Sequence, residues 1–423
     1  MAGIVVFGAQ WGDEGKGRFV DYLAAKADAV VRYQGGNNAG HTVVAKGVTY
    51  KLHLVPSGIL SPGKACIIAN GVVIDPAALR EEIEYLAQRG VSVENLYISD
   101  RAHMVMPYHR ALDELNEQKL GEFKIGTTGK GIGPCYADKI SRIGLRMCDM
   151  LDVQSFPKKL KKMVDDKNEI ITKIYGGTPL DYEEILEEYR QHAQYFEKYI
   201  CDTVTLINDY HKNGKTLLFE GAQGMLLDID FGTYPYVTSS HPNTGGVCAG
   251  AGIGPQAITQ VIGVVKAYTT RVGEGPFVTE LLDDMGEAIR QKGQEFGTTT
   301  GRPRRCGWLD LVIVDFAAKT SGITGWALSR MDTLGGFEKV CVCTGYEIDG
   351  KVVNTYPASL ETLAKAKPIY QEFEGWTDEL SQIREYDKLP AAAKKYVEFI
   401  ENRTGIPVVM IGVGAGREEC VMK

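Results

Sequence analysis

Residues 4–18 read Ile-Val-Val-Phe-Gly-Ala-Gln-Trp-Gly-Asp-Glu-Gly-Lys-Gly-Arg, and this stretch decides the fold. Its short apolar run, which is followed by glycine, is typical of a buried parallel strand. The glycine-rich loop after it leads into a helical pattern at 19–26 and a second strand-like run at 29–33. The chain therefore opens with a predicted βαβ unit that carries a phosphate-type loop in its first turn.

The chemistry of that loop follows from its residue types. Glycines let backbone N–H groups approach a phosphate, and Lys16 could neutralise a β- or γ-phosphate. The loop departs from a Walker A motif at Gln10, in place of the first glycine, and at Gly17, in place of the Ser/Thr that ligates Mg²⁺. Asp13 is then the expected metal ligand. A purely structural glycine turn is the alternative.

The same alternation continues outward along the chain. Further strand candidates are 66–69, 96–99, 217–220, 261–267, 326–329, 340–343 and 408–411, with helical patterns such as 76–89 and 391–402 between several of them. This pattern predicts an α/β fold with a largely parallel central sheet covered by helices on both faces. We expect a P-loop-NTPase-like single domain over residues 1–423, with helical and loop insertions that include a charged helical segment at about 156–212.

Composition narrows the classes of function. The 423 residues carry 47 Lys and Arg against 54 Asp and Glu, a net charge of −7, which argues against general nucleic-acid binding. The nine cysteines lack the spacing of a disulfide framework, and Cys341 and Cys343 are interpreted as strand alternation in preference to a metal site. With no signal-peptide pattern and no apolar run of spanning length, we expect a cytoplasmic protein that contacts no membrane.

Two further loops offer polar side chains to a ligand. Residues 34–42 follow the second strand and contain Asn37, Asn38 and His41. The crevice beyond the strand ends of a doubly wound sheet is where ligands bind, and a histidine there offers a proton near neutral pH. Residues 124–134 bring hydroxyls, backbone amides and lysine together, which suits a monophosphate. Their glycine spacing, like that of residues 250–254, is not a dinucleotide fingerprint.

The strongest anion-binding pattern is at residues 297–305, Gly-Thr-Thr-Thr-Gly-Arg-Pro-Arg-Arg. Its hydroxyls and guanidinium groups match carboxylates and phosphates. Nucleic acid is the rival interpretation, but the patch is isolated on an acidic chain, so a small polyanionic substrate is favoured. Asp332, which follows another apolar run, could accept both the ring N–H and the amine of guanine.

Together, in this order, these segments resemble the adenylosuccinate synthetase family. The resemblance rests on residues 10–17, 34–42, 126–134, 219–224, 233–240, 266–273 and 297–304, and it extends from residue 4 to about 418. It implies a ligase that joins L-aspartate to IMP with GTP as co-substrate, in the first committed step from IMP to AMP. Asp13 would take the N1 proton of IMP, the 6-oxyanion would attack the γ-phosphorus of GTP with His41 as the acid, and aspartate would displace phosphate.

The resemblance also implies site residues. The catalytic set would be Asp13, Lys16, His41 and Gln223. The GTP-binding set would be Gly12, Glu14, Gly15, Lys16, Gly17, Arg18, Gly40, His41, Thr42, Arg304, Arg330, Met331, Asp332, Gly412, Val413 and Gly414. The IMP-binding set would be Asp13, Lys16, Asn38, Ala39, Gly40, His41, Thr128, Arg142, Gln223, Thr238 and Arg302. The aspartate-binding set would be Thr298, Thr299, Thr300, Gly301, Arg302 and Arg304. One Mg²⁺ per subunit would lie on Asp13 and Gly40, and Arg142 would reach across a homodimer interface.

Two departures from the family pattern concern the guanine end. Arg330 stands where the family usually has lysine, and residues 412–417 lack the usual serine and proline of Ser-x-Gly-Pro-x-Arg. We therefore expect GTP to be preferred, but bound less tightly or less selectively. A regulatory GTPase, an inactive nucleotide-binding scaffold and a phage-type enzyme acting on dGMP are the remaining alternatives. A GTPase would not explain Asn37, Asn38, His41 or the loop 297–305. Retention of Asp13, Lys16 and His41 argues against a scaffold, and the Asp13 carboxylate argues against a phage-type enzyme.

Overall fold

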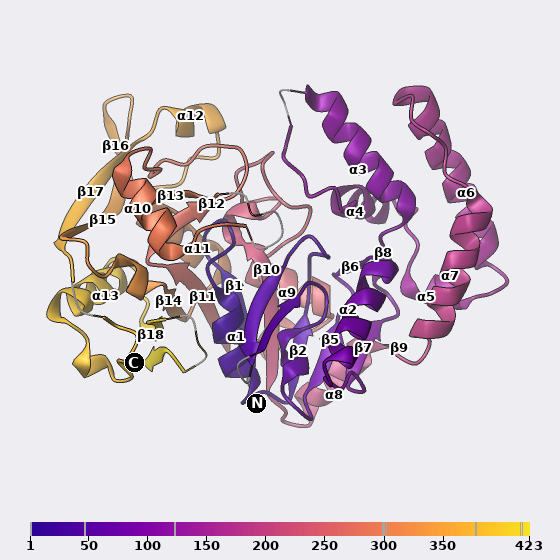
Figure 1. Ribbon diagram of the computed structural model, residues 1–423, viewed down its shortest axis with the longest axis horizontal. Helices are drawn as coiled ribbons and strands as arrows, with labels where there is room; N and C mark the ends of the chain where they lie inside the picture. Colours follow the sequence, from indigo (N-terminus) through magenta and orange to yellow (C-terminus); the bar gives the residue numbers. More distant parts are fainter. Residues whose placement is uncertain are drawn as a thin grey trace.

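The computed structural model describes residues 2–45, 48–121, 124–297, 301, 303–376, 379–414, 416 and 418–423. Its centre is a ten-stranded sheet with the strand order β19-β18-β14-β11-β1-β10-β2-β5-β7-β9 (Figure 1). Neighbouring strands are parallel except β18 and β19, which pair antiparallel. The predicted largely parallel α/β sheet is confirmed.

Apart from β9 and β19, which no apolar run indicated, the bounds of the central strands agree closely with the apolar runs of the sequence. They are β1 Gly3–Gly8, β2 Ala29–Arg32, β5 Ala65–Ile68, β7 Leu96–Ser99, β9 Ile200–Cys201, β10 Leu217–Gly224, β11 Gln260–Lys266, β14 Gly325–Ser329, β18 Val408–Gly412 and β19 Cys420–Met422. Two small two-stranded sheets pair β3 His41–Ala45 with β4 Val48–Leu52, and β6 Val73–Ile74 with β8 His103–Met104.

Helices connect these strands. Their bounds are α1 Lys16–Ala24, α2 Pro76–Gln88, α3 Pro107–Leu120, α4 Ile132–Ile140, α5 Met147–Leu151, α6 Phe156–Glu169, α7 Tyr182–Phe196, α8 Thr203–Lys212, α9 Thr244–Ala251, α10 Asp284–Gly293, α11 Leu311–Ser321, α12 Leu360–Ala364 and α13 Ala391–Thr404. The short helices are η1 Ser57–Leu60, η3 Ile170–Ile174, η4 Met225–Leu227, η5 Pro255–Ala257, η6 Met331–Leu334 and η7 Tyr386–Lys388.

Both faces of the central sheet are covered. Alternate residues of β1 face opposite sides of the sheet, and each side packs in an apolar cluster with helices. Val6 packs in one apolar cluster with Phe19 and Val20 of α1. Val5 and Phe7 pack in another, larger cluster that includes side chains of α9 and α11. Continuous apolar runs in the sequence are therefore what a strand buried on both faces requires.

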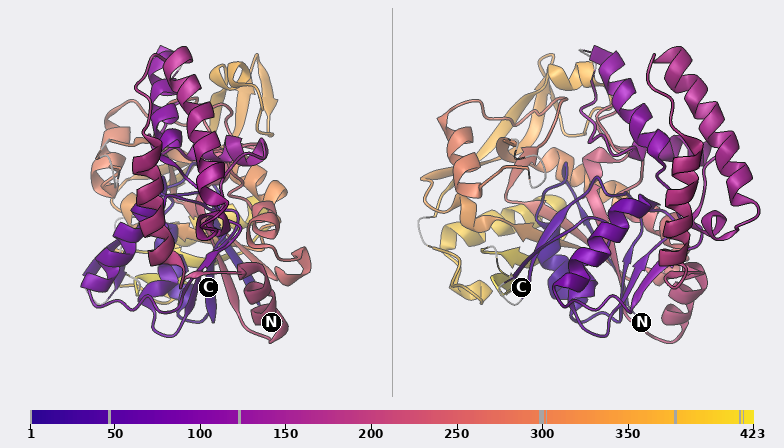
Figure 2. Two further views of the ribbon diagram at one scale, coloured as in Figure 1. Left: turned by 90° about the vertical axis from the view of Figure 1, so that its right-hand side faces the viewer. Right: turned by 45° about the vertical axis from the view of Figure 1, so that its right-hand side comes forward.

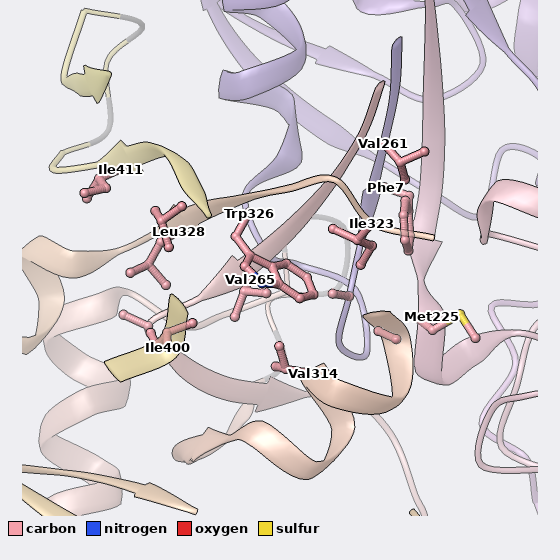
Figure 3. Close-up of a cluster of buried hydrophobic side chains, with 14 of the residues drawn as sticks. Phe7, Met225, Val261, Val265, Val314, Ile323, Trp326, Leu328, Ile400 and Ile411 are labelled. Atoms are coloured by element: carbon pink, nitrogen blue, oxygen red, sulfur yellow. The ribbon is translucent and has the colours of Figure 1, made fainter. Parts of the chain in front are cut away.

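The larger cluster is centred on Trp326 of β14 (Figure 3). Its indole is fully buried and donates a hydrogen bond from Nε1 to Thr404 Oγ1 at 3.0 Å. A Cβ at Gly263 of the neighbouring β11 would lie 2.5 Å from the Trp326 ring, so the ring packs where only glycine leaves room. This packing fixes β11 and β14, whose carboxyl ends carry site residues.

A second, five-stranded sheet stands beside the central one, on the left in Figure 1. It contains β12 Tyr268–Arg271, β13 Arg305–Asp310, β15 Lys339–Ile348, β16 Lys351–Val353 and β17 Lys367–Glu374. Residues 340–343 do form a strand, but they belong to this sheet, where β15 pairs antiparallel with β16 and β17. Their expected place in the parallel sheet was wrong, because an apolar run does not specify which strands it pairs with.

The charged segment 156–212 folds mainly as helices, and with α3 it lies on the side of the molecule opposite the second sheet (Figures 1 and 2). Phe156, Leu160 and Tyr189 on α6 and α7 are buried in a separate apolar cluster. The segment also contributes β9, the edge strand of the central sheet. Within the described residues, no helix has both the length and the apolar character to cross a membrane.

Candidate active site

The carboxyl ends of the central parallel strands share one edge of the sheet, and the predicted motifs follow them there. The phosphate loop follows β1, which lies between β10 and β11. The loop 34–40 follows β2, and Gln223 is the last residue but one of β10. Asp332 follows β14, and Gly412 ends the adjacent β18. The fold thus brings together side chains that are up to 400 residues apart in the sequence.

The phosphate loop is shaped by a buried carboxylate. Glu14 has no exposed surface, and it accepts hydrogen bonds from the backbone N–H groups of Gln10 at 3.0 Å and Gly12 at 2.8 Å. Lys16 Nζ lies 2.7 Å from Glu14 Oε2, so the ammonium is held at the start of α1. The Glu14 carboxylate therefore stabilises the loop from inside the protein and is not available to bind a ligand.

Gln10 explains one departure from the Walker A pattern. Its side chain donates to the carbonyl of Tyr268 at 3.0 Å and accepts from the backbone N–H of Lys266 at 2.9 Å. Both partners belong to the segment that joins the central sheet to the second sheet. A glycine could not make this connection, so the substitution ties the phosphate loop to β11 and β12.

Asp13 sits in the left-handed backbone region, with φ 59°, between glycines that also have positive φ. This turn leaves its side chain 38% exposed, in contrast with the buried Glu14 beside it. Asp13 Oδ2 lies 3.0 Å from Arg304 Nε, which forms an ion pair across the site. A non-glycine residue at positive φ costs free energy, so the position of Asp13 indicates a functional constraint.

A buried charge cluster stands behind Arg304. Glu295 Oε2 accepts from Arg304 Nη1 at 2.6 Å, and Glu295 Oε1 accepts from Lys266 Nζ at 2.8 Å. Burial alone would raise the pKa of Glu295, but Lys266 and Arg304 outweigh it and hold the pKa at about 2. The carboxylate is therefore ionised at neutral pH and fixes the guanidinium that faces Asp13. Sequence reasoning gave Glu295 no role, since a single glutamate two residues before the loop 297–305 carries no motif.

A network of amides connects β2 to β10. Gln34 Nε2 donates to the Ala222 carbonyl and to Gln223 Oε1, both at 3.1 Å, and Gln223 Nε2 donates to Asn38 Oδ1 at 3.2 Å. Gln223 has φ 56°, a second strained residue at the site. Arg32 is buried below the loop and donates to the Gly36 carbonyl at 2.9 Å. The backbone that carries Asn38, Ala39 and Gly40 is thereby held in place.

Several predicted residues lie at the boundary of the described structure. His41 and Thr42 begin β3, but their side chains are outside the described part of the chain. Thr298, Thr299, Thr300 and Arg302 lie outside the described residues altogether. Gly301 is described and has φ 65°. The predicted roles of these side chains stay predictions.

The loop expected to bind a monophosphate is held by another anion. The backbone N–H groups of Ile125, Gly126 and Thr127 point at the Glu117 carboxylate, at 3.2, 2.9 and 3.2 Å. Thr128 beside them is exposed. The amides therefore hold a carboxylate, that of Glu117 on α3, and the monophosphate expected at this loop stays a prediction.

Arg142 and Thr238 are placed by their backbones. Arg142 is exposed and adopts φ 63° two residues after the end of α4. Thr238 donates its N–H to the Leu227 carbonyl at 2.8 Å, which holds it in the loop after β10. Neither side chain has a hydrogen bond to another predicted site residue among the described ones.

The guanine end of the predicted site is partly buried. Arg330 has φ 62° and starts η6, Met331 is fully buried, and Val413 follows Gly412 with no exposed surface. Burial raises the pKa of Asp332, against the opposing effect of Arg330 and Arg18. Gly414 lies beside Glu419, whose backbone closes the turn by accepting from Val413.

Comparison with known proteins agrees with this geometry. The family model described as adenylosuccinate synthetase matches residues 5–421. An adenylosuccinate synthetase from Caldanaerobacter subterraneus subsp. tengcongensis is 57% identical over 100% of this chain and 99% of its own length. The solved structure of fully ligated adenylosuccinate synthetase from Plasmodium falciparum is 40% identical, covers 100% of both chains and superposes with a TM-score of 0.94.

A more distant structure shares the fold alone. The cyanophage S-2L succinoaminodeoxyadenylate synthetase is 22% identical, with a TM-score of 0.63 over 100% of this chain and 95% of that one. The much higher identity to the cellular enzymes, over essentially their full length, decides against the phage-type, GTPase and scaffold alternatives. With its phosphate loop, amide network and arginine loop at one edge of a parallel sheet, the chain belongs to the adenylosuccinate synthetase family.

Proposed function

We propose that Asp13 is the base that starts the reaction of this ligase, the GTP-dependent joining of L-aspartate to IMP. The observation that carries the proposal is its carboxylate, which a strained turn lifts out of the phosphate loop while Arg304 pairs with it at 3.0 Å. Asp13 would remove the N1 proton of IMP. The resulting 6-oxyanion would attack the γ-phosphorus of GTP, with GDP as the leaving group.

The second step replaces phosphate by nitrogen. The amine of aspartate would attack C6 of 6-phosphoryl-IMP, and the C6–O bond would break to release phosphate. His41 would donate a proton or hydrogen bond at the transferred phosphoryl group. Lys16, held by Glu14 at the start of α1, would neutralise charge on the same phosphates.

Each substrate is proposed to bind a different loop of the site. For GTP, the loop residues Gly15 and Gly17 would offer backbone N–H groups to phosphate at the N-terminus of α1. For IMP, Asn38 and Gln223, which already hydrogen-bond each other, would position the base. For aspartate, residues 298–302 and Arg304 would bind the carboxylates in bidentate fashion.

Mg²⁺ fits the donor set at Asp13. The exposed Asp13 carboxylate and the carbonyl of the exposed Gly40 are hard oxygen donors of the kind that Mg²⁺ prefers, and phosphates of the nucleotide would supply others. We propose one Mg²⁺ per subunit at these two residues. When bound, it would neutralise negative charge on the transferring phosphoryl group.

A homodimer in which Arg142 acts across the interface is the proposed assembly. Arg142 is exposed, and the apolar side chains on either side of it are exposed as well, Ile140 by 78% and Ile143 by 44%. A second chain packed on this surface would remove both apolar groups from water, which supports the assembly. The partner's Arg142 would then reach the phosphate of IMP. The cytoplasmic location stays a prediction from the sequence.

The reaction is tested by omission. Purified protein is incubated with IMP, L-aspartate, GTP and Mg²⁺, each left out in turn, and the products are followed by mass spectrometry. We expect adenylosuccinate and GDP only in the complete mixture. The Asp13→Asn variant keeps the shape of the side chain but is a poor base and a weaker metal ligand, so its turnover should fall by about a thousandfold or more. Near-normal turnover of Asp13→Asn would remove Asp13 from the mechanism.

A further inference from the structure

Two side chains at the nucleotide end of the site have buried polar atoms that no described residue satisfies. Arg18 Nε and Nη1 are buried without a hydrogen-bond partner in the described part of the chain, and so is Asp332 Oδ1. Each side chain shifts the pKa of the other towards its charged form, yet the guanidinium nitrogens and the carboxylate oxygens lie farther apart than the 4.0 Å of an ion pair. Buried donors and acceptors are nearly always satisfied in native proteins, so this pair needs an explanation.

Gly412 explains how the guanidinium reaches this place. A Cβ at Gly412 would lie 2.4 Å from Arg18 Nη1, so any larger residue there would push the guanidinium away. The ring of Phe19 also holds the group, with Arg18 Cζ 5.8 Å from its centroid. Arg18 therefore extends from α1 to the end of β18, next to the strand that leads into Asp332.

Arg18 offers hydrogen-bond donors and Asp332 offers an acceptor, and the two side chains are too far apart to bond each other directly. A ligand group that fits must present an acceptor next to a donor. The edge of guanine does so, with O6 as the acceptor beside N1–H and the N2 amine. Adenine presents an amine donor where guanine has O6 and lacks a proton on N1, so it would leave both groups unsatisfied.

We propose that Arg18 determines nucleotide specificity by donating to O6 of the guanine of GTP, while Asp332 accepts from N1 and N2. This role rests on the proposed GTP-dependent reaction, and it adds a residue that reads the base independently of Asp332. In this proposal the Arg18 guanidinium contacts the base of GTP and not its phosphates, although Arg18 follows the phosphate loop directly in sequence. Since the guanidinium lies against Gly412, at the end of the strand that pairs with β14, the base is the favoured contact.

The test compares nucleotides that differ at the base. In Arg18→Met, kcat/KM is measured with GTP, ITP and ATP, and dissociation constants are measured with GDP, IDP and ADP by calorimetry. We expect the preference for guanine over adenine nucleotides to fall by about ten- to a hundredfold, the range for losing one hydrogen bond to a charged group. Inosine nucleotides, which retain O6, should lose affinity along with guanine nucleotides. Lys26→Met, an exposed change just beyond the same helix, is the control and should keep the preference.

An equal loss for all three bases would overturn the proposal, because it would place Arg18 on the phosphates or in a structural role. Gly412→Ala provides an independent arm, since its methyl group displaces the Arg18 head without removing it, and it should reproduce the lost preference. Unchanged preference in a folded Gly412→Ala protein would also count against the proposal. Asp332→Asn separates the two assignments: if it keeps the guanine preference while Arg18→Met loses it, the proposed role of Asp332 fails and that of Arg18 stands.

Discussion

Glu295 shows how one residue outside every motif can control a site. Its two carboxylate oxygens hold different cations, Lys266 and Arg304, and Arg304 in turn faces Asp13. A buried carboxylate that satisfies two cations is costly to lose, because its removal leaves uncompensated charges in a low-dielectric interior. The position of Asp13, the proposed base, thus depends on a buried residue that acts through Arg304.

Glu295→Gln should therefore destabilise the protein and impair catalysis together. We expect a loss of roughly 3 kcal/mol in the free energy of unfolding, measured by urea denaturation at pH 7. Turnover should also fall, since Arg304 loses the partner that fixes it. Glu287→Gln, which removes an exposed carboxylate paired with Arg290, is the matched control and should change stability by no more than about 0.5 kcal/mol. Equal stability of the two variants would refute the role of Glu295.

The pH dependence of that difference follows from the depressed pKa. The pKa of Glu295 is about 2 in the folded protein, against an ordinary value of 4.5. A depressed carboxyl pKa contributes stability that is present above the unfolded value and is lost as pH falls through the folded one. The stability gap between the parent and Glu295→Gln should thus stay constant above about pH 5 and shrink towards pH 2. A gap that widens on acidification would contradict the ionised cluster.

At the scale of elements, the sequence predicts what local pattern encodes. Apolar runs located the central strands, and the loops after them could be expected to meet, since parallel strands end at one edge. Pattern does not encode partners that are distant in sequence. Lys266 lies inside a recognisable segment, but its pairing with Glu295 is visible only in three dimensions. For the same reason residues 340–343 were predicted in the wrong sheet. Strand β9 was not predicted at all, because two residues are too few to form a pattern.

The helical segment supports the proposed IMP phosphate contact through a buried lysine. Lys167 of α6 donates to Asp138 Oδ1 at 2.6 Å, and His109 Nε2 lies 2.9 Å from Asp138 Oδ2. Burial would raise the pKa of Asp138, but His109 and Lys167 outweigh it and lower the pKa. The Asp138 carbonyl accepts from Ile143 and Gly144, which closes the turn around Arg142. Three helices thus converge on the backbone that presents this arginine.

Lys167→Met should loosen that turn. We expect a loss of about 1–3 kcal/mol in unfolding free energy and a raised KM for IMP, with kcat at saturating IMP changed much less. Lys167→Arg, which keeps the charge, should restore part of the KM. Lys162→Met removes an exposed lysine of the same helix that pairs with Asp166, and it should leave KM unchanged. If Lys162→Met and Lys167→Met behave alike, the buried pair has no positioning role.

At the scale of the whole molecule, the proposed function requires a second copy of the chain to supply Arg142 to the site. The proposal can be tested by mixing two inactive proteins, Asp13→Ala and Arg142→Ala. Random exchange of equal amounts puts about half of the dimers in the mixed form, and one of the two sites in each mixed dimer then combines an intact Asp13 with an intact partner arginine. Activity should recover to about a quarter of the parent value, without exceeding it. If Arg142 acts within its own subunit, every site in the mixture carries one of the two substitutions and no activity returns. Two controls guard against a false negative. Co-purification of differently tagged subunits shows that the subunits have exchanged. Sedimentation of the same mixture shows that dimers have formed.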